Sequence, residues 1–198
     1  MSEYRLITTA ADRYAIHQDL ARHFEHQDVG RVQFAEAPSD GTRRTVMVRT
    51  ERPSSGDVGW MPVSPPALND DGLLAAGARF RFVIEFNPVK AAILPEQLRG
   101  RGKRVGITRP EEAGDWLRAR LEASGFVVDA RLSVQNLPSL SLRKPAGGHP
   151  MVFVRHRAAG VVEISDTALA TALYRGGIGK GRAFGLGMLV LLPSSTAP

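Results

Sequence analysis

Residues 79–87, Arg-Phe-Arg-Phe-Val-Ile-Glu-Phe-Asn, form the most regular stretch of the sequence. Large apolar side chains occupy every second position: Phe80, Phe82, Ile84 and Phe86. This period is that of a β-strand with one buried face. Pro88 follows directly and ends the strand, because proline has no N–H to donate to a sheet ladder. The segment therefore predicts a strand with one packed face, while its other face meets solvent or a ligand.

Weaker patterns on both sides of this strand predict the remaining elements. Further strands are expected over residues 3–9, 31–37, 44–50, 126–135, 138–143, 151–155, 160–164 and 186–192. Helices are expected from an Asp12 cap to about His26, from a Thr108–Glu111 capping box to Gly125, and from Asp166 to about Arg175. Residues 51–77 are rich in Pro, Gly, Ser and Asp and predict an irregular surface segment.

The order of these elements predicts the fold class. Each half of the chain runs strand, helix, strand, strand, with a last strand returning. This order fits an α+β chain of two tandem ferredoxin-like (β-α-β-β-α-β, RRM-like) units, the first with a reduced second helix. We expect an N-terminal ferredoxin-like domain over 1–88, a basic linker over 89–105, and a C-terminal ferredoxin-like domain over 106–198, with a basic hairpin and a glycine-rich loop.

Composition excludes several classes of chemistry. The 198 residues contain no cysteine, so disulfides, thiolate metal sites and cysteine nucleophiles are ruled out. No apolar run approaches the ~18 residues that a membrane span needs, and the first residues do not resemble a signal peptide. We therefore expect a cytoplasmic protein without a membrane partner.

Positive charge is concentrated in one segment. The formal net charge is +6, and residues 79–109 hold eight basic side chains against two acidic ones. Arginine outnumbers lysine 22 to 4, which a coding bias can also produce. A concentrated basic stripe can displace counterions from a phosphate backbone, so its location favours an anionic polymer as the partner.

A glycine-rich loop lies between the last predicted helix and the last strand. It spans residues 176–187 and contains Gly176, Gly177, Gly179, Gly181, Gly185 and Gly187. It is not a Walker A loop, because Tyr174 and Gly181 stand where that motif needs glycine and Ser or Thr. It could bring backbone N–H groups, Lys180 and Arg182 close to a phosphate or a base edge. A tight helix-to-strand turn is the alternative.

Two pairs of side chains on the first predicted helix could carry chemistry. Tyr14 and His17 are three residues apart and so share one helical face near its N-terminus, although half-buried packing would explain them equally. His23 and His26 are one turn apart, a spacing that suits a metal pair. No carboxylate at a further helical step completes such a metal site.

Taken in order, these features resemble one family. They are Tyr14-x-x-His17, the strand from Arg79 to Asn87-Pro88-Val89-Lys90, Gly102-Lys103-Arg104-Val105, the helix with Trp116-Leu117, and the terminal glycine-rich loop. The chain resembles CasE, the CRISPR RNA-processing endoribonuclease of type I-E Cascade systems. This resemblance implies metal-independent cleavage of precursor CRISPR RNA at the 3′ base of each repeat hairpin, without a cofactor. It also implies that the product stays bound and that other Cascade subunits, above all the backbone subunit, are partners.

The resemblance also assigns residues. Tyr14 and His17 match the active-site Tyr and His of the family. Arg22 falls where relatives can carry a basic residue near the scissile phosphate, although position i+5 turns it away from His17 on a straight helix. Arg143 and Lys144 match a hairpin that relatives place against the RNA stem. The residues expected to grip RNA are thus Arg79, Arg81, Lys90, Arg101, Lys103, Arg104, Arg143, Lys144, Lys180 and Arg182.

Because the chain has no cysteine, a cleavage reaction cannot use a cysteine nucleophile. RNA carries a nucleophile of its own, the 2′-hydroxyl of its ribose. In-line attack on the adjacent phosphate leaves a 2′,3′-cyclic phosphate and a 5′-hydroxyl. His17, an imidazole with an ordinary pKa near ~6.5, is expected to act as general base or acid, and Tyr14 to orient the reacting group. Two other hypotheses remain: a non-catalytic subunit that binds the RNA hairpin, and a metal-dependent nuclease that uses His23 and His26.

Overall fold

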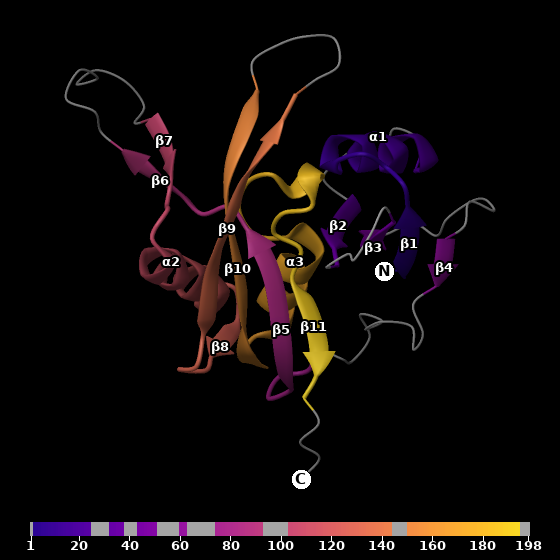
Figure 1. Cartoon of the computed structure of the whole chain (residues 1–198). Coiled ribbons are helices and arrows are strands. Elements are labelled where there is room, and N and C mark those ends of the chain that lie inside the picture. Colours follow the sequence, from indigo (N-terminus) through magenta and orange to yellow (C-terminus); the bar gives the residue numbers. More distant parts are fainter. Residues whose placement is uncertain are drawn as a thin grey trace.

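The computed structural model describes residues 2–24, 32–37, 43–50, 60–62, 74–92, 103–143 and 150–194. Within these ranges the chain forms a four-stranded sheet, a five-stranded sheet and a separate two-stranded ribbon. Figure 1 shows the N-terminal sheet with its helix on one side of the molecule and the larger C-terminal sheet on the other. The expected α+β class with two ferredoxin-like units is confirmed. Within these ranges no helix is long and apolar enough to cross a membrane.

The N-terminal unit contains one helix packed on an antiparallel sheet. Its elements are β1 (Ser2–Thr8), α1 (Arg13–His23), β2 (Val32–Glu36), β3 (Arg44–Thr50) and β4 (Trp60–Pro62), in the sheet order β2-β3-β1-β4. Asp12 caps α1 as predicted, since its Oδ1 accepts a hydrogen bond from the Ala15 N–H at 2.8 Å. Ile16 and Leu20 of the helix are buried against Phe34 of β2. This packing fixes the face of α1 that carries Tyr14 and His17.

The C-terminal unit has the ferredoxin-like order with one additional strand, since both β8 and β9 stand between α2 and β10. Its elements are β5 (Arg79–Phe86), α2 (Pro110–Glu122), β8 (Phe126–Val128), β9 (Ser133–Leu142), β10 (Met151–Ile164), α3 (Thr167–Gly176) and β11 (Val190–Pro193). The sheet order is β11-β5-β10-β8, and β9 also pairs with β10. As the sequence predicts, Phe80, Phe82, Ile84 and Phe86 of β5 are buried, and Ala113, Leu117 and Leu121 of α2 are fully buried in the same core. The Asp166 cap of α3 is also confirmed, by a 2.9 Å hydrogen bond from the Leu169 N–H.

The position of β5 corrects the expected division of the chain at residue 88. Alternation of side chains identified the strand but not its partners, and β5 pairs with β10 and β11 of the C-terminal sheet. The strand that closes the N-terminal sheet beside β1 is instead β4, inside the segment 51–77 that was expected to be irregular. The two sheets therefore divide between β4 and β5.

The expected basic linker over 89–105 contains paired strands. β6 (Val89–Ala92) and β7 (Lys103–Gly106) form an antiparallel ribbon, with Val89 opposite Gly106. In Figure 1 this ribbon stands beside the top of the C-terminal sheet, near the long hairpin of β9 and β10. The segment is thus a hairpin that returns to the start of α2.

Three other local predictions were wrong. The strand expected over 126–135 is interrupted, because β8 ends at Val128 and β9 begins at Ser133 and continues to Leu142. The strands expected over 151–155 and 160–164 are one continuous strand, β10. The capping box of Thr108 and Glu111 does not form, because Pro110 occupies the first helical position and Arg109 becomes the N-cap, without a side-chain cap bond. Proline restricts the preceding residue to extended backbone, and Arg109 has φ −80° and ψ 128°.

Candidate functional site

Tyr14 and His17 lie together, both half-buried, on the side of the first turns of α1 that faces away from the N-terminal core. Their ring centroids are 6.3 Å apart, and the rings meet edge to face. Ile16 and Leu20, on the opposite side of the helix, are buried in the N-terminal core. The core packing of α1 therefore turns the phenol and the imidazole to the same side, as their spacing predicts.

The two rings meet a third one from the far end of the chain. Phe184, in the glycine-rich loop, is stacked near Tyr14 with a centroid distance of 6.2 Å and an interplanar angle of 21°. It meets His17 edge-on at 5.3 Å. Phe184 was not predicted as a site residue, although it is the one aromatic residue of the loop. The site thus combines one face of α1 with the loop between α3 and β11.

The surroundings of His17 favour its neutral form. The imidazole is half-buried and lines a small pocket with Phe24, Phe34 and Ala183. Burial lowers the pKa of His17 below its ordinary value of 6.5, because apolar surroundings penalise the imidazolium. At neutral pH the ring is therefore uncharged and can accept a proton.

The glycine-rich loop follows a path that its glycines permit. Residues 182–184 form a single 3-10 turn, flanked by Gly181 and Gly185 in the left-handed region. A Cβ built on Gly185 would lie 2.4 Å from Cε2 of Phe34, a distance that no real side chain shows. Glycine at this position therefore lets the loop approach β2 closely and places Phe184 over α1.

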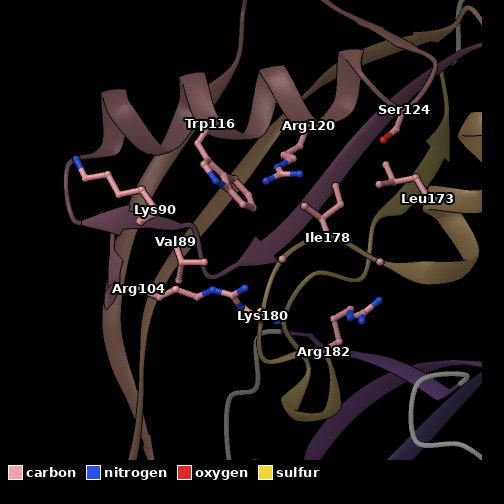
Figure 2. Close-up of a pocket in the computed structure, with 13 residues that line it drawn as sticks. Val89, Lys90, Arg104, Trp116, Arg120, Ser124, Leu173, Ile178, Lys180 and Arg182 are labelled. Carbon is pink, nitrogen blue, oxygen red and sulfur yellow. The ribbon is translucent and has the colours of Figure 1, made fainter. Parts of the chain in front are cut away.

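A basic cleft opens on another side of the same loop. It has a volume of about 740 Å³ and lies between the loop, the β6–β7 ribbon and α2 (Figure 2). Its basic lining residues are Lys90, Arg104, Arg120, Lys180 and Arg182. Four of these were predicted to bind RNA; Arg120 was not, because it belongs to a helix whose charges are otherwise mixed.

An aromatic wall completes the cleft. Trp116 lies between Phe86, with which it stacks at 6.0 Å, and the guanidinium of Arg120, 5.5 Å from its ring. Figure 2 shows Trp116 and Arg120 side by side on α2, pointing toward Ile178 in the loop. Positive charge beside an aromatic ring is the combination that proteins use to hold nucleic-acid strands.

The structure does not bring the rest of the predicted basic stripe to this cleft. Arg79 lies at the other end of β5 from the loop, within 3.7 Å of Asp129 and 3.9 Å of Glu163. Arg81 is exposed on the same strand. Lys90 lines the cleft but also pairs with Glu112 of α2.

Two further predicted RNA-binding residues, Arg143 and Lys103, lie on the two hairpins. Arg143 is exposed directly after the end of β9. Lys103 is the first residue of β7. Arg101 and Lys144 lie outside the described residues, so the structure does not place them.

Arg22 lies away from Tyr14 and His17. Its side chain is 74 % exposed and pairs with Asp19 at 2.9 Å. It lines a groove with the end of β1, on another side of α1 from the pocket that holds His17. The angular separation expected for position i+5 is therefore present in the helix.

The described part of the chain offers no cluster of three or more His, Asp or Glu side chains that could hold a metal ion. His23 ends α1 and its ring meets Phe24 edge-on at 4.9 Å. His26 lies outside the described residues, so a His23–His26 metal pair stays a hypothesis from the sequence.

Comparisons with known proteins agree with this fold. A protein-family model described as "CRISPR associated protein" matches residues 3–193. The CRISPR-associated endoribonuclease Cse3 of Thermus thermophilus is 34% identical over 146 residues, which are 69% of this chain and 66%, just under two thirds, of that protein.

Solved structures extend the similarity to almost the whole chain. A structure of the CRISPR endoribonuclease Cse3 bound to a 19-nucleotide RNA is 29% identical and superposes with a TM-score of 0.76, over 98% of this chain and 100% of that one. Cas6e of Escherichia coli, at 20% identity, shares the fold with a TM-score of 0.74 over 98% and 100% of the two chains. With the family model covering nearly its full length, the chain belongs to the CasE family of CRISPR-associated proteins.

Proposed function

We propose that this protein is the endoribonuclease that processes precursor CRISPR RNA in a type I-E Cascade system. It recognises the hairpin of each repeat, cuts at the 3′ base of that hairpin, and then remains bound to its product. The observation that carries this proposal is the position of residues 180–184. Their Lys180 and Arg182 line the basic cleft, while Phe184 lies against Tyr14 and His17. One short segment thus borders both a surface for a phosphate backbone and the pair formed by Tyr14 and His17, of which the imidazole is suited to proton transfer.

In the proposed reaction RNA attacks its own chain. The neutral His17 accepts the proton of the 2′-hydroxyl, and the 2′-oxygen forms a bond to the adjacent phosphorus. The bond from phosphorus to the 5′-oxygen breaks, and that oxygen takes up a proton and leaves as a hydroxyl. The products are a 2′,3′-cyclic phosphate and a 5′-hydroxyl, so no metal is needed to supply the nucleophile. Tyr14 holds the reacting group in line by hydrogen bonding.

We propose that the protein binds the RNA stem through the shape and the negative charge of the RNA backbone. A double-stranded RNA stem presents phosphates and a deep major groove that side chains cannot read easily, so proteins grip it mainly through its backbone. Lys180, Arg182, Arg104 and Arg120 surround a cleft that suits such a backbone. The relative Cse3 has been seen bound to RNA, including an RNA that represents a pre-cleavage complex. We infer the same class of ligand for this chain.

Structures with the same fold also suggest which proteins bind this chain. A CRISPR RNA-guided surveillance complex contains a chain with this fold, at 18% identity and a TM-score of 0.72. We propose that this protein, with its bound RNA product, joins other Cascade subunits, with the backbone subunit as its direct neighbour.

The decisive experiment incubates the purified protein with an end-labelled repeat RNA in EDTA. We expect a single cut, a 2′,3′-cyclic phosphate on the upstream product, and no cut when the scissile nucleotide carries a 2′-deoxy sugar. Intact RNA after long incubation, with tight binding retained, would instead identify a non-catalytic hairpin-binding subunit. Cleavage that appears only after a divalent metal is added would identify a metal-dependent nuclease.

A further inference from the structure

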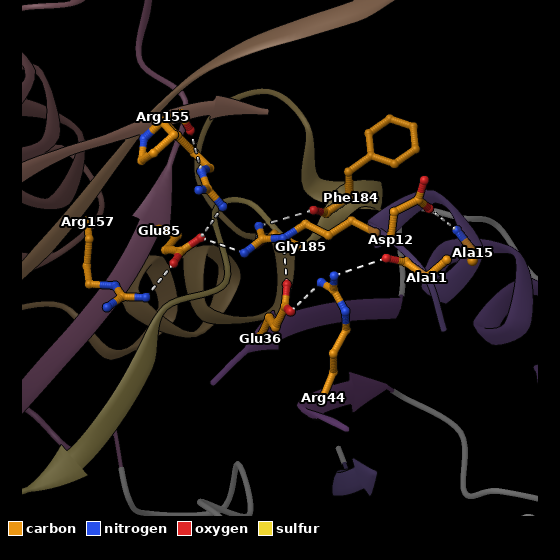
Figure 3. Close-up of polar contacts among 12 residues, drawn as sticks. Ala11, Asp12, Ala15, Glu36, Arg44, Glu85, Arg155, Arg157, Phe184 and Gly185 are labelled. Carbon is orange, nitrogen blue, oxygen red and sulfur yellow. Dashed lines mark hydrogen bonds and ion pairs between the residues drawn. The ribbon is translucent and has the colours of Figure 1, made fainter. Parts of the chain in front are cut away.

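Arg13 is a buried cation that reaches both units of the molecule. Its side chain is only 4% exposed, although it directly precedes Tyr14 in the sequence. Its Nε donates to Glu36 of β2 at 2.9 Å, and its Nη2 donates to Glu85 of β5 at 2.7 Å. The two carboxylates, of Glu36 and Glu85 (labelled in Figure 3), belong to different sheets, so the guanidinium bound to both joins the N-terminal and C-terminal units.

The third guanidinium nitrogen of Arg13 binds the backbone of the glycine-rich loop. Nη1 donates to the backbone carbonyl of Gly185 at 3.2 Å and to that of Phe184 at 3.4 Å. Figure 3 shows Phe184 extending from this point of the loop, close to the start of α1. Arg13 therefore binds the backbone of the same residue whose ring meets Tyr14 and His17.

The carboxylates around Arg13 are themselves held by other arginines. Glu36 accepts a hydrogen bond from Arg44 at 2.6 Å, and Glu85 accepts one from Arg157 at 2.7 Å. Burial alone would raise the pKa of Glu85, but Arg13 and Arg157 outweigh burial and lower it. Glu85 thus remains a charged partner, and its bond and that of Glu36 fix the guanidinium in the plane from which it binds the loop.

We propose that Arg13 is a positioning residue for RNA cleavage, which holds the loop so that the Phe184 ring fixes the relative placement of Tyr14 and His17. This inference rests on the proposed function and deepens it. The phenol and the imidazole are only half-buried, so rotation about their side-chain bonds would otherwise separate them. Contact with one rigid ring restricts both. Restricting the reacting groups to one geometry is a large part of what such catalysis requires.

Phe184→Ala tests the proposal without disturbing the ion pairs of Arg13. At saturating protein we expect the single-turnover rate to fall about 10- to 100-fold, while the dissociation constant of the repeat hairpin changes less than about twofold. Phe184→Tyr retains a ring of the same shape and should recover most of the rate. A Phe184→Ala protein that cuts at the wild-type rate, or that loses rate and affinity in equal proportion, would overturn the proposal.

Arg13→Lys tests the other half of the proposal. Lysine keeps the charge between Glu36 and Glu85 but lacks the planar fork that reaches the loop as well. We expect the same loss of rate with retained affinity, and a wild-type rate in this variant contradicts the inference. Arg118→Lys is the matched control, because Arg118 also donates to two backbone carbonyls, those of Val128 and Asp129, but these lie away from the glycine-rich loop, so its rate should stay near wild type.

Separate measurements test the proposed function and the positioning role of Arg13 and Phe184. If wild-type protein does not cut repeat RNA under any condition, the proposed function is wrong. If wild-type protein cuts, His17→Ala does not, and Phe184→Ala cuts normally, then only the positioning role is wrong. A thermal melt of each variant identifies any that fails to fold, and Phe184→Ala then decides, because it leaves every bond of Arg13 in place.

Discussion

The guanidinium carbon of Arg49 lies 3.5 Å from the centroid of the Tyr174 ring. Arg49 belongs to β3 of the N-terminal sheet and Tyr174 to α3 of the C-terminal unit. The Tyr174 hydroxyl donates to Glu3 at 2.6 Å, and Glu3 also accepts from Nε of Arg49 at 2.6 Å. The other nitrogens of Arg49 donate to the carbonyls of Tyr174 and Leu189 at 3.0 Å. Together with the bonds of Arg13, this cluster fixes the two units to each other.

Arg49→Ala is expected to destabilise the protein strongly. Glu3 would remain nearly buried without its cation, and breaking such a pair typically costs about 3 to 5 kcal/mol. Tyr174→Phe removes one hydrogen bond to a charged group and should cost about 1.5 to 3 kcal/mol. Urea unfolding of both variants measures these changes. Two variants with wild-type midpoints would show that the cluster contributes nothing to stability.

His17→Ala is expected to abolish cleavage without weakening RNA binding. The substitution removes the group proposed to accept the 2′-hydroxyl proton, but the basic cleft lies on the other side of the loop and keeps its charge. A gel-shift titration and a single-turnover assay on the same repeat RNA separate the two properties. Full cleavage by this variant would remove His17 from the mechanism.

The cleavage rate is expected to depend on pH through His17. Burial lowers the pKa of the imidazole below 6.5, and only the neutral ring can accept a proton. The single-turnover rate should therefore rise with pH through a midpoint below 6.5 and then level off. Titration of the ring by NMR gives the same midpoint independently. A rate that increases as the pH falls through this range would assign His17 the role of general acid.

Binding is expected to depend more on the cleft than on the far end of β5. Lys180→Ala or Arg182→Ala should weaken hairpin binding and reduce the salt slope of log K by about one unit for each phosphate that is no longer neutralised. Arg79→Ala is the matched comparison, because Arg79 lies beside Asp129 and Glu163 and away from the cleft. Equal effects of all three variants would mean that the basic stripe as a whole, and not the cleft, binds the RNA.

Gly185→Ala is expected to displace the loop and slow cleavage. The residue has φ +75°, where a side chain costs about 1 to 2 kcal/mol, and its Cβ would also collide with Phe34. Gly176→Ala is the control, since a Cβ there meets nothing within 4 Å and alanine favours the end of α3. Unchanged cleavage in Gly185→Ala would contradict the tight docking of the loop on β2.

Local sequence patterns predicted the secondary elements well and their pairing poorly. Alternation identified β5, and the Asp12 and Asp166 caps located two helix starts, because each signal lies within a few residues. The partners of β5 lie elsewhere in the chain, in β10 and β11, and no periodicity inside the strand identifies them. The wrong boundary at residue 88 and the missed pairing of β6 with β7 have this common cause.

In the candidate site, too, the sequence predicted local features but not contacts between distant segments. The three-residue spacing of Tyr14 and His17 predicted their shared face, since helical geometry alone decides it. Phe184 and Arg13 were missed because their contacts join segments about 170 residues apart. A buried arginine has no local signature, and Arg13 differs from its exposed neighbours only through the acids that the fold brings to it.

The shared use of residues 180–184 has a further consequence for how this protein can vary. A single insertion there would move the Phe184 ring off the helix and shift Lys180 relative to the cleft at the same time. A change in the length of this segment is therefore expected to lower the affinity for the RNA hairpin and the cleavage rate together.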